Sequence, residues 1–529
     1  MSEHLIALPV ILVLAGAVFI GAMGPITAQA CSPQDFRRRR NLWFVLTLAA
    51  FLTHSFWLFM VVAALVLALT VKAESNRLAL FFGLMLAVPP IAASVPGLGV
   101  FNELFSINLM RLLALVVLLP TYLVLRGQSG VDPFGRLWCD KLLLGYLALE
   151  VVLTLPYRTV TSVLRDSVFY AFTDVFLPYY VASRSLRTLK AFRDAIAAFV
   201  VGVLVLSVML MFEFARSRLL YVSLAPAMGV FDYGWGTYLG RAGGMRAMAS
   251  IGHPIAAGYT CAVALGLYLY LQRFVPGVLA RRVGALVLVG GMVGALSRAP
   301  WVGAAFIVVV FVVLGPAPKR GLMKIGLAVL LALPLLILTP AGQRFIDLLP
   351  WVGTVEAYNV EGRERLAEVA YRVFLQNPFF GRFDYTGNDE MESLRGGHGI
   401  IDTVNTYVVV ALRGGGVSLA LFCGFFLVAG ASLLRAMRRV SDHGDEGKLL
   451  GRALFATLMG MLFMIGTVSP VLDIPTLYWS VGGLMVACVR LLEQRRAAPL
   501  VAAAPRAAPG PRRMPGTGGS FSPHGSGRK

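Results

Sequence analysis

Long apolar stretches recur from one end of the chain to the other, and they constrain the fold more than any other feature. A helix crosses the hydrocarbon core of a bilayer with about 17–25 residues. Of the 529 residues, 58% are hydrophobic and only 14% are charged, whereas about 25% of the residues of a soluble domain are charged. This composition excludes a soluble enzyme, a disordered protein and a disulfide-stabilised secreted scaffold. It indicates a polytopic integral membrane protein.

The apolar stretches predict an all-α fold with about 14 transmembrane helices. The stretch 41–71 fits either one long tilted helix or a hairpin of two, which would add one crossing. The first stretch lacks the basic start and small-residue exit of a signal peptide, so we expect it to be retained as a span. The predicted spans are 5–23, 41–71, 78–96, 109–125, 141–156, 166–182, 192–214, 251–272, 283–297, 300–315, 322–340, 416–434, 452–470 and 475–491.

Basic residues gather in alternate connections between these spans, which predicts that those connections face the cytoplasm. The net charge of +20 therefore needs no nucleic acid, since no polar domain could present a basic face to one. Arg37–Arg40 would join the same side only if 41–71 is a hairpin. The basic connections are 184–193, 273–282, 319–324, 435–448 and 490–496.

We expect residues 1–492 to form one multispanning membrane domain and residues 493–529 to form a disordered, basic cytoplasmic tail. The tail is rich in Ala, Pro, Gly and Arg and cannot bury enough apolar surface to become ordered.

Residues 341–403 form the largest predicted exterior loop. The loop contains ten of the 27 acidic residues of the chain, and a long, charged loop in an otherwise apolar protein is where we expect the chemistry. Residues 361–376 carry helical signals, and Asn377-Pro378 should end that helix. Its arginines, Arg363 among them, either face a ligand or pair with acidic residues of the same helix.

Arginines on the predicted outer side are candidates for binding an anion. The loop 216–250 contains Arg241 and Arg246 but only one acidic residue, which runs against the usual charge bias of exterior loops. Arg298 lies between two apolar runs, where a guanidinium group is costly unless it meets an anion or water. A phosphate group would satisfy all three; anchoring to lipid head groups is the alternative.

Two residues of the large loop could act on protons. His398 and Asp402 are four residues apart and would share a face if a helix has begun there. A histidine beside a carboxylate can act as a general base near neutral pH, although a lone loop histidine often has no such role. Asp166 and Asp174, inside a predicted span, are either functional or paired with Arg165 or with another helix.

Several common signatures are absent from the sequence. The first exterior segments contain no paired-acid D-x-D motif, and there is no Walker loop, HExxH or CxxC motif. The five cysteines show no ligand spacing. We therefore expect chemistry without a metal or cofactor, and not a metal-dependent lipid-sugar transferase.

Four sequence elements, in this order, resemble the bacterial O-antigen ligase and Wzy-type polysaccharide polymerase superfamily over about residues 190–480. One departure is Val404, which stands where the family commonly has a histidine that activates the acceptor. The elements are Arg241-Ala-Gly243 with His253-Pro254; Ser297-Arg298-Ala299-Pro300-Trp301; Glu361-Gly-Arg363 followed by Asn377-Pro378-Phe-Phe-Gly381; and Asn405-Thr-Tyr407 followed by Gly414-Gly-Gly416.

The resemblance implies metal-independent glycosyl transfer on the periplasmic side of a bacterial inner membrane. The donor would be an oligosaccharide on undecaprenyl diphosphate, held by Arg298 and Arg363 with help from Arg241 or Arg246, and His398 or Asp402 would be the base. Because of Val404 we expect a polymerase of surface polysaccharide ahead of an O-antigen ligase. Implied partners are membrane lipid, a flippase and a chain-length co-polymerase. A flippase or other transporter is the rival reading, but the charges gather in one loop and no inverted repeat is visible.

Overall fold

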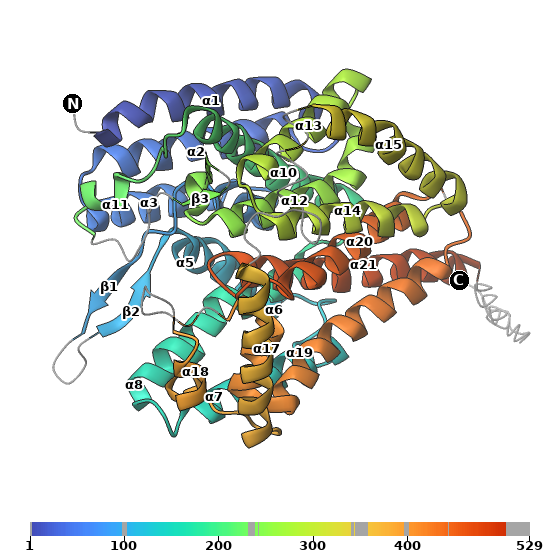
Figure 1. The fold of residues 1–529 in the computed structure, drawn as a ribbon. Helices are drawn as coiled ribbons and strands as arrows, with labels where there is room; N and C mark the ends of the chain where they lie inside the picture. The colour runs from blue at the N-terminus through green and yellow to red at the C-terminus, as the bar shows by residue number, and fades with distance from the viewer. Residues whose placement is uncertain are drawn as a thin grey trace, which may run out of the picture.

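The fold was obtained as a computed structural model, in which residues 3–97, 103–230, 239–241, 243–339, 343, 358–395, 401, 403–442 and 444–503 are described. It is predominantly helical, as expected. Most long helices run across the view of Figure 1, while α17 lies across their direction. Two short hairpins, β1–β2 and β3–β4, depart from the purely helical prediction.

The helices in the first half are α1 (Glu3–Thr27), α2 (Pro33–Leu52), α3 (Phe56–Val71), α4 (Arg77–Leu84), α5 (Leu109–Leu113), α6 (Leu119–Arg126), α7 (Trp138–Thr154), α8 (Val160–Ser162), α9 (Leu177–Ser185), α10 (Leu189–Arg216) and α11 (Leu224–Ala227). Three π-helical segments interrupt this half: η1 (Ala114–Leu118), η2 (Val163–Phe169) and η3 (Phe172–Phe176).

The second half contains α12 (Pro254–Leu271), α13 (Val278–Gly294), α14 (Arg298–Val313), α15 (Pro318–Leu338), α17 (Tyr358–Gln376), α18 (Asp389–Glu392), α19 (Thr406–Arg438), α20 (Glu446–Ile465) and α21 (Ile474–Ala503). Short 3₁₀ turns are η4 (Ala249–Ile251), η5 (Gln272–Phe274) and η6 (Tyr385–Gly387). The strands are β1 (Ala93–Pro96), β2 (Glu103–Ile107), β3 (Gly240–Arg241) and β4 (Gly244–Met245).

The structure resolves the alternatives for 41–71 and corrects one predicted span. Helix α2 ends at Leu52, and α3 begins at Phe56 with Ser55 as its cap. The stretch 41–71 is therefore a hairpin of α2 and α3. The predicted span 78–96 is wrong: α4 ends at Leu84, and 93–96 is strand β1. Pro89-Pro90 lie between them, and prolines cannot continue a helix because they lack the N–H group.

Within the described residues, seven helices are long and apolar enough to cross a membrane. They are α1, the α5–α6 segment, α10, α12, α19, α20 and α21. The chain is therefore a multi-pass membrane protein by helix length and composition. The full count of about 14 spans and the outward placement of 341–403 stay predictions. The predicted tail begins differently from expectation, because α21 continues to Ala503; residues 504–529 lie outside the described ranges.

Helix α10 lies at the centre of one half of the bundle, where it packs on α1, α4, α12 and α13. In the other half α19 packs on α7 and α21, and α20 packs on α14. Helix α12 joins the two halves through contacts with both α13 and α20. This arrangement brings the beginnings of α12 and α14 together.

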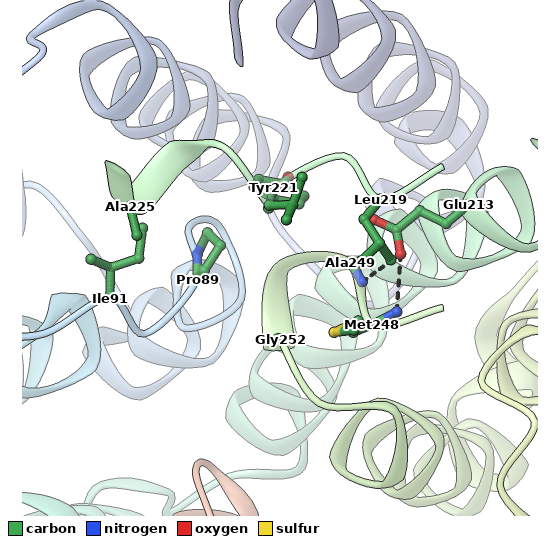
Figure 2. Close-up of a pocket in the computed structure, with 10 residues that line it drawn as sticks. Pro89, Ile91, Glu213, Leu219, Tyr221, Ala225, Met248, Ala249 and Gly252 are labelled. Atoms are coloured by element: carbon green, nitrogen blue, oxygen red, sulfur yellow. Dashed lines mark hydrogen bonds between the residues drawn. The ribbon is translucent and has the colours of Figure 1, made fainter. Parts of the chain in front are cut away.

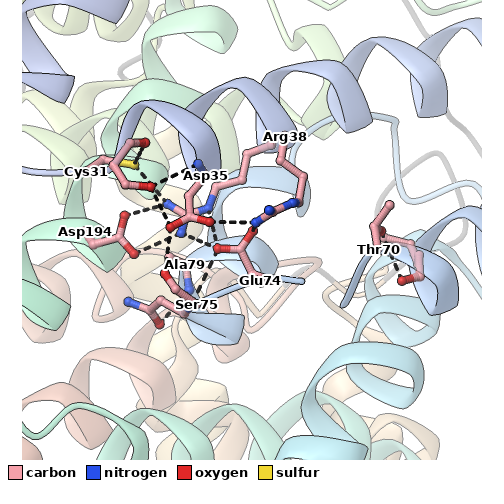
Figure 3. A network of polar contacts seen from close by, with 12 residues as sticks. Cys31, Asp35, Arg38, Thr70, Glu74, Ser75, Ala79 and Asp194 are labelled. Atoms are coloured by element: carbon pink, nitrogen blue, oxygen red, sulfur yellow. Dashed lines mark hydrogen bonds and ion pairs between the residues drawn. The ribbon is translucent and has the colours of Figure 1, made fainter. Parts of the chain in front are cut away.

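A buried network of charges ties the α1–α2 turn to α10 (Figure 3). Arg39 is only 6% exposed, and its guanidinium group bonds Asp194 of α10 at 2.7 and 2.9 Å and Glu74 of the α3–α4 turn. Burial raises the pKa of Glu74, and the Arg39 charge opposes that shift. A buried ion pair is tolerated only when its hydrogen bonds are complete. This network therefore fixes α2, the α3–α4 turn and α10 relative to one another.

We predict that Arg39→Ala lowers the free energy of unfolding by about 3–5 kcal/mol, because it leaves two buried carboxylates without their cation. The measurement is thermal or denaturant unfolding of the detergent-solubilised protein. Arg37→Ala is the matched control, since Arg37 is exposed on the same helix and should change stability by less than about 0.5 kcal/mol. Equal effects of the two substitutions would contradict a structural role for the network.

Candidate functional site

Three of the four arginines predicted to bind an anion meet at one turn, between α13 and α14. Arg241 donates from Nη1 to the carbonyl of Leu296 at 2.8 Å. Arg246 donates from Nε to the carbonyl of Ala295 at 3.5 Å. Arg298 begins α14 two residues later. Side chains that are 50 residues apart in sequence thus surround one short segment, which we call the arginine turn (residues 295–298).

The arginine turn has an uncommon backbone that its neighbours hold in place. Leu296 has a φ of +44°, a conformation that residues with a Cβ seldom adopt. Trp301 is buried and donates from Nε1 to the carbonyl of Met292 at 3.0 Å. This bond connects the start of α14 to the end of α13 across the turn. Ser297 is also buried.

Helix α12 closes the turn from the other side. A Cβ added at Gly258 would lie 2.9 Å from Cγ of Pro300, so only glycine permits this approach. His253 caps the start of α12 in an extended conformation, one turn before Gly258. The Arg241…His253 and Ser297…Trp301 elements are therefore parts of one site.

A buried carboxylate anchors the loop that carries Arg241 and Arg246 (Figure 2). Glu213, near the end of α10, accepts backbone N–H bonds from Leu220, Met248 and Ala249 at 2.8–2.9 Å. The same carboxylate lines a mainly apolar pocket of about 370 Å³ together with Ile91 and others. Because its bonds go to backbone donors, Glu213 positions the loop and is not itself a candidate for proton transfer.

The NP-x-x-G element and the glycine run of α19 lock into each other through the backbone. Gly416 N donates to Pro378 O at 2.8 Å, and Arg382 N donates to Leu412 O at 2.8 Å. Helix α19 breaks at Gly415, which has φ 67° and ψ −169°. A Cβ there would overlap the backbone of Phe379, and one on Gly381 would lie 2.5 Å from Leu412 O.

Helix α17 forms as expected and packs on α18 and α19. Its buried residues Leu366, Val369, Ala370 and Val373 share one face. Arg363 is exposed, and the described contacts do not place it at the arginine turn. Arg372 pairs with Glu390 of α18 at 2.8 Å, and not with an acidic residue of its own helix.

The two proposed bases, His398 and Asp402, lie outside the described residues. The next described helix, α19, starts at Thr406, with Asn405 as its cap. Asn405 Oδ1 accepts from the backbone of Tyr407 at 2.9 Å and of Val408 at 3.2 Å. Val404, at the position of the family histidine, packs against the small apolar cluster beneath α17.

Asp166 and Asp174, inside the predicted span 166–182, both form ion pairs, which was one of the two alternatives for them. Arg165 bonds Asp166 at 2.7 Å. Arg111 bonds Asp174 at 2.9 Å and lies 3.5 Å from the ring centre of Tyr170. An ion pair with a neighbouring arginine thus accounts for each of the two carboxylates. In the part of the chain that the structure describes, no three His, Cys, Asp or Glu residues gather as a metal site.

Sequence reasoning missed Asp473, a buried carboxylate directly before α21. Its Oδ2 accepts from Thr260 of α12 at 3.0 Å, while its Oδ1 is buried without a hydrogen-bond partner. Burial raises its pKa to about 6, and the Thr260 hydrogen bond opposes the shift. The available signal was a lone acid in the short connection between two apolar spans.

The arrangement provides cationic hydrogen-bond donors at the arginine turn and a buried acid against α12. Guanidinium groups bind phosphate oxygens in a fixed geometry and stabilise charge on a departing phosphate. A carboxyl group with a raised pKa can exchange a proton near neutral pH.

We predict that Gly415→Ala destabilises the protein by at least about 2 kcal/mol, because the new Cβ meets backbone at a positive φ. Gly424→Ala in the same helix is the control, as its Cβ would lie 3.7 Å from a flexible Leu142 side chain. Unfolding measurements test this, with chymotrypsin cleavage at Phe379 and Phe380 as a local readout. Resistance to cleavage equal to that of the wild type would argue against the interlock.

Asp473 should make stability depend on pH. Since its folded pKa is raised from 3.8 to about 6, the contribution of Asp473 to the free energy of unfolding is largest below about pH 4 and should fall by up to about 3 kcal/mol between about pH 4 and pH 6. Asp473→Asn removes this loss. Unfolding curves of both proteins between pH 4 and pH 7.5 check the prediction, and parallel curves would refute it.

Comparison with known protein families gives a match over part of the chain. The sequence model of the family described as O-antigen ligase matches residues 283–423. This segment contains the arginine turn, α17, the NP-x-x-G element and the first part of α19, including its glycine break. Arg241 and Arg246 lie before it. No curated protein matches the chain.

Proposed function

From the match of residues 283–423 to the O-antigen ligase family model, we propose that this chain transfers glycans from undecaprenyl diphosphate at the outer face of a bacterial inner membrane. In the favoured form it polymerises oligosaccharide repeats into a surface polysaccharide. The observation that carries the proposal is the gathering of Arg241, Arg246 and Arg298 at the arginine turn.

In the proposed reaction an acceptor hydroxyl attacks the anomeric carbon of the donor sugar. The new bond joins the acceptor oxygen to that carbon, and the bond from the carbon to the diphosphate oxygen breaks. Negative charge then grows on the diphosphate, where the three arginines would stabilise it. Such stabilisation favours the transition state more than the ground state, and so it accelerates the chemical step.

The hydroxyl proton needs an acceptor. His398 and Asp402 remain the proposed bases, with Arg363 as a further proposed contact to the diphosphate. A further candidate is Asp473, which bonds Thr260, two residues along α12 from the Gly258–Pro300 contact and on another face of that helix. Pairing of Asp473 with Thr260 leaves one of its oxygens for a proton.

A ligase that moves the finished glycan to a lipid A-core is the second candidate. The description of the matching family favours it. Val404 favours the polymerase, because an apolar residue packed against the α17 cluster cannot replace an activating histidine. Both candidates use the same donor and differ in the acceptor.

We predict that Arg298→Ala reduces polysaccharide synthesis by about 100-fold or more, the loss typical of removing one charge-stabilising donor. The test is the size profile of surface polysaccharide in a deletion strain complemented with each variant. Arg282→Ala is the matched control, since Arg282 is exposed at the opposite end of α13. Membrane abundance of every variant is measured alongside.

The same experiment separates the candidates. Single repeats without long chains in the deletion strain support the polymerase, and long chains left on the carrier lipid support the ligase. Repeats trapped on the cytoplasmic face would refute both and favour a flippase. His398→Ala, Asp402→Ala and Asp473→Asn in the same strain identify the base by their failure to complement.

A further inference from the structure

Arg413 lies directly before the break in α19, and its charge is incompletely matched. The nearest carboxylate oxygen, Oε2 of Glu150 in α7, is 3.8 Å from its Nη2. Charge-assisted hydrogen bonds are about 2.7–2.9 Å long. Its Nε is buried and has no hydrogen-bond partner. A buried donor of this kind is normally satisfied by protein, water or a ligand.

Two further arginines lie around the same point. The guanidinium carbon of Arg413 lies 4.4 Å from the ring centre of Phe383, and that of Arg158 lies 5.9 Å from it. Arg382 is fixed beside them by its N–H bond to Leu412 O at 2.8 Å. Arg158 and Arg382 are exposed. We call these three residues, with Phe383, the arginine platform.

The arginine platform lies at the level of a membrane surface. From Gly416 to Arg438, α19 rises about 1.5 Å per residue, or about 34 Å, close to the hydrocarbon thickness of a bilayer. The far end of this segment has the basic residues expected at the cytoplasmic side, Arg435 and Arg438. The near end is the glycine break, which adjoins Arg413.

Exposed apolar side chains border the platform. Phe379 is 71% exposed and Phe380 is 56% exposed, and both belong to the turn that locks onto the α19 break. On the preceding helix, Tyr371 and Leu375 are also exposed. Large apolar side chains beside arginines are typical of surfaces that enter the head-group region of a bilayer.

We propose that the arginine platform binds the phosphate head group of a membrane lipid, at a site separate from the arginine turn. The guanidinium group of Arg413 would donate to phosphate oxygens that Glu150 does not reach, and Arg158 would donate from the other edge of Phe383. Phe379 and Phe380 would lie among the first acyl carbons of the same leaflet. The proposal does not depend on the proposed glycosyl transfer.

Lipid binding to the purified full-length protein in a zwitterionic detergent tests the site. Native mass spectrometry follows titration with undecaprenyl phosphate, phosphatidylglycerol and inorganic phosphate as separate probes. Arg413→Gln should weaken binding of at least one of the two lipids about 10-fold or more, and Arg158→Gln should weaken it less. Glu150→Gln should strengthen binding, because it removes the competing carboxylate and keeps the shape of the side chain.

Arg282→Gln is the control, because Arg282 is an exposed arginine near the start of α13, a helix with no described contact to the platform residues; it should bind as the wild type does. Loss for undecaprenyl phosphate alone assigns the site to the carrier lipid, and loss for both lipids assigns it to general head groups. Unchanged binding in Arg413→Gln, or equal competition by inorganic phosphate, would overturn the proposal. A normal unfolding temperature for Glu150→Gln keeps the test independent of folding defects.

Discussion

Charge burial in a medium of low polarity is the constraint on which the rest of this structure depends. A charged side chain between packed apolar helices needs a complete set of partners. The described residues meet this demand at three places: Arg39 bonds Glu74 and Asp194, Arg184 bonds Asp140 at 2.6 Å, and Glu213 accepts three backbone N–H groups. Each of these pairings joins elements that are distant in sequence, and so each one fixes how the helices lie.

The geometry of the candidate site depends on anchors of this kind and on close packing. Glu213 holds the loop that delivers Arg241 and Arg246, and the packing of Gly258 on Pro300 holds α12 against the same turn. A third anchor is the backbone interlock between the Pro378 turn and Gly416. Backbone bonds and a close glycine contact leave little freedom, so the outer loop meets α19 in one register.

Much of the helical framework could be predicted from the length of the apolar stretches, and α17 from local helical signals with the stop at Asn377-Pro378. The prediction failed at 78–96, where average hydrophobicity concealed Pro89-Pro90 and a strand. Of the candidate site, Arg241, Arg246 and Arg298 were found because cations in an apolar chain are costly. Asp473 was missed because its significance lies in burial and in its contact with Thr260, neither of which sequence spacing reports.

The sequence by itself determined a multi-pass membrane protein with arginines at the ends of particular helices, because hydrophobicity and charge are properties of single residues and short windows. Its motifs also determined the resemblance that the match at 283–423 confirms. Only the folded chain brought three arginines to one turn and placed Arg413 3.8 Å from its nearest carboxylate, that of Glu150. These are contacts over long sequence separation, and they follow from helix packing that no local pattern encodes.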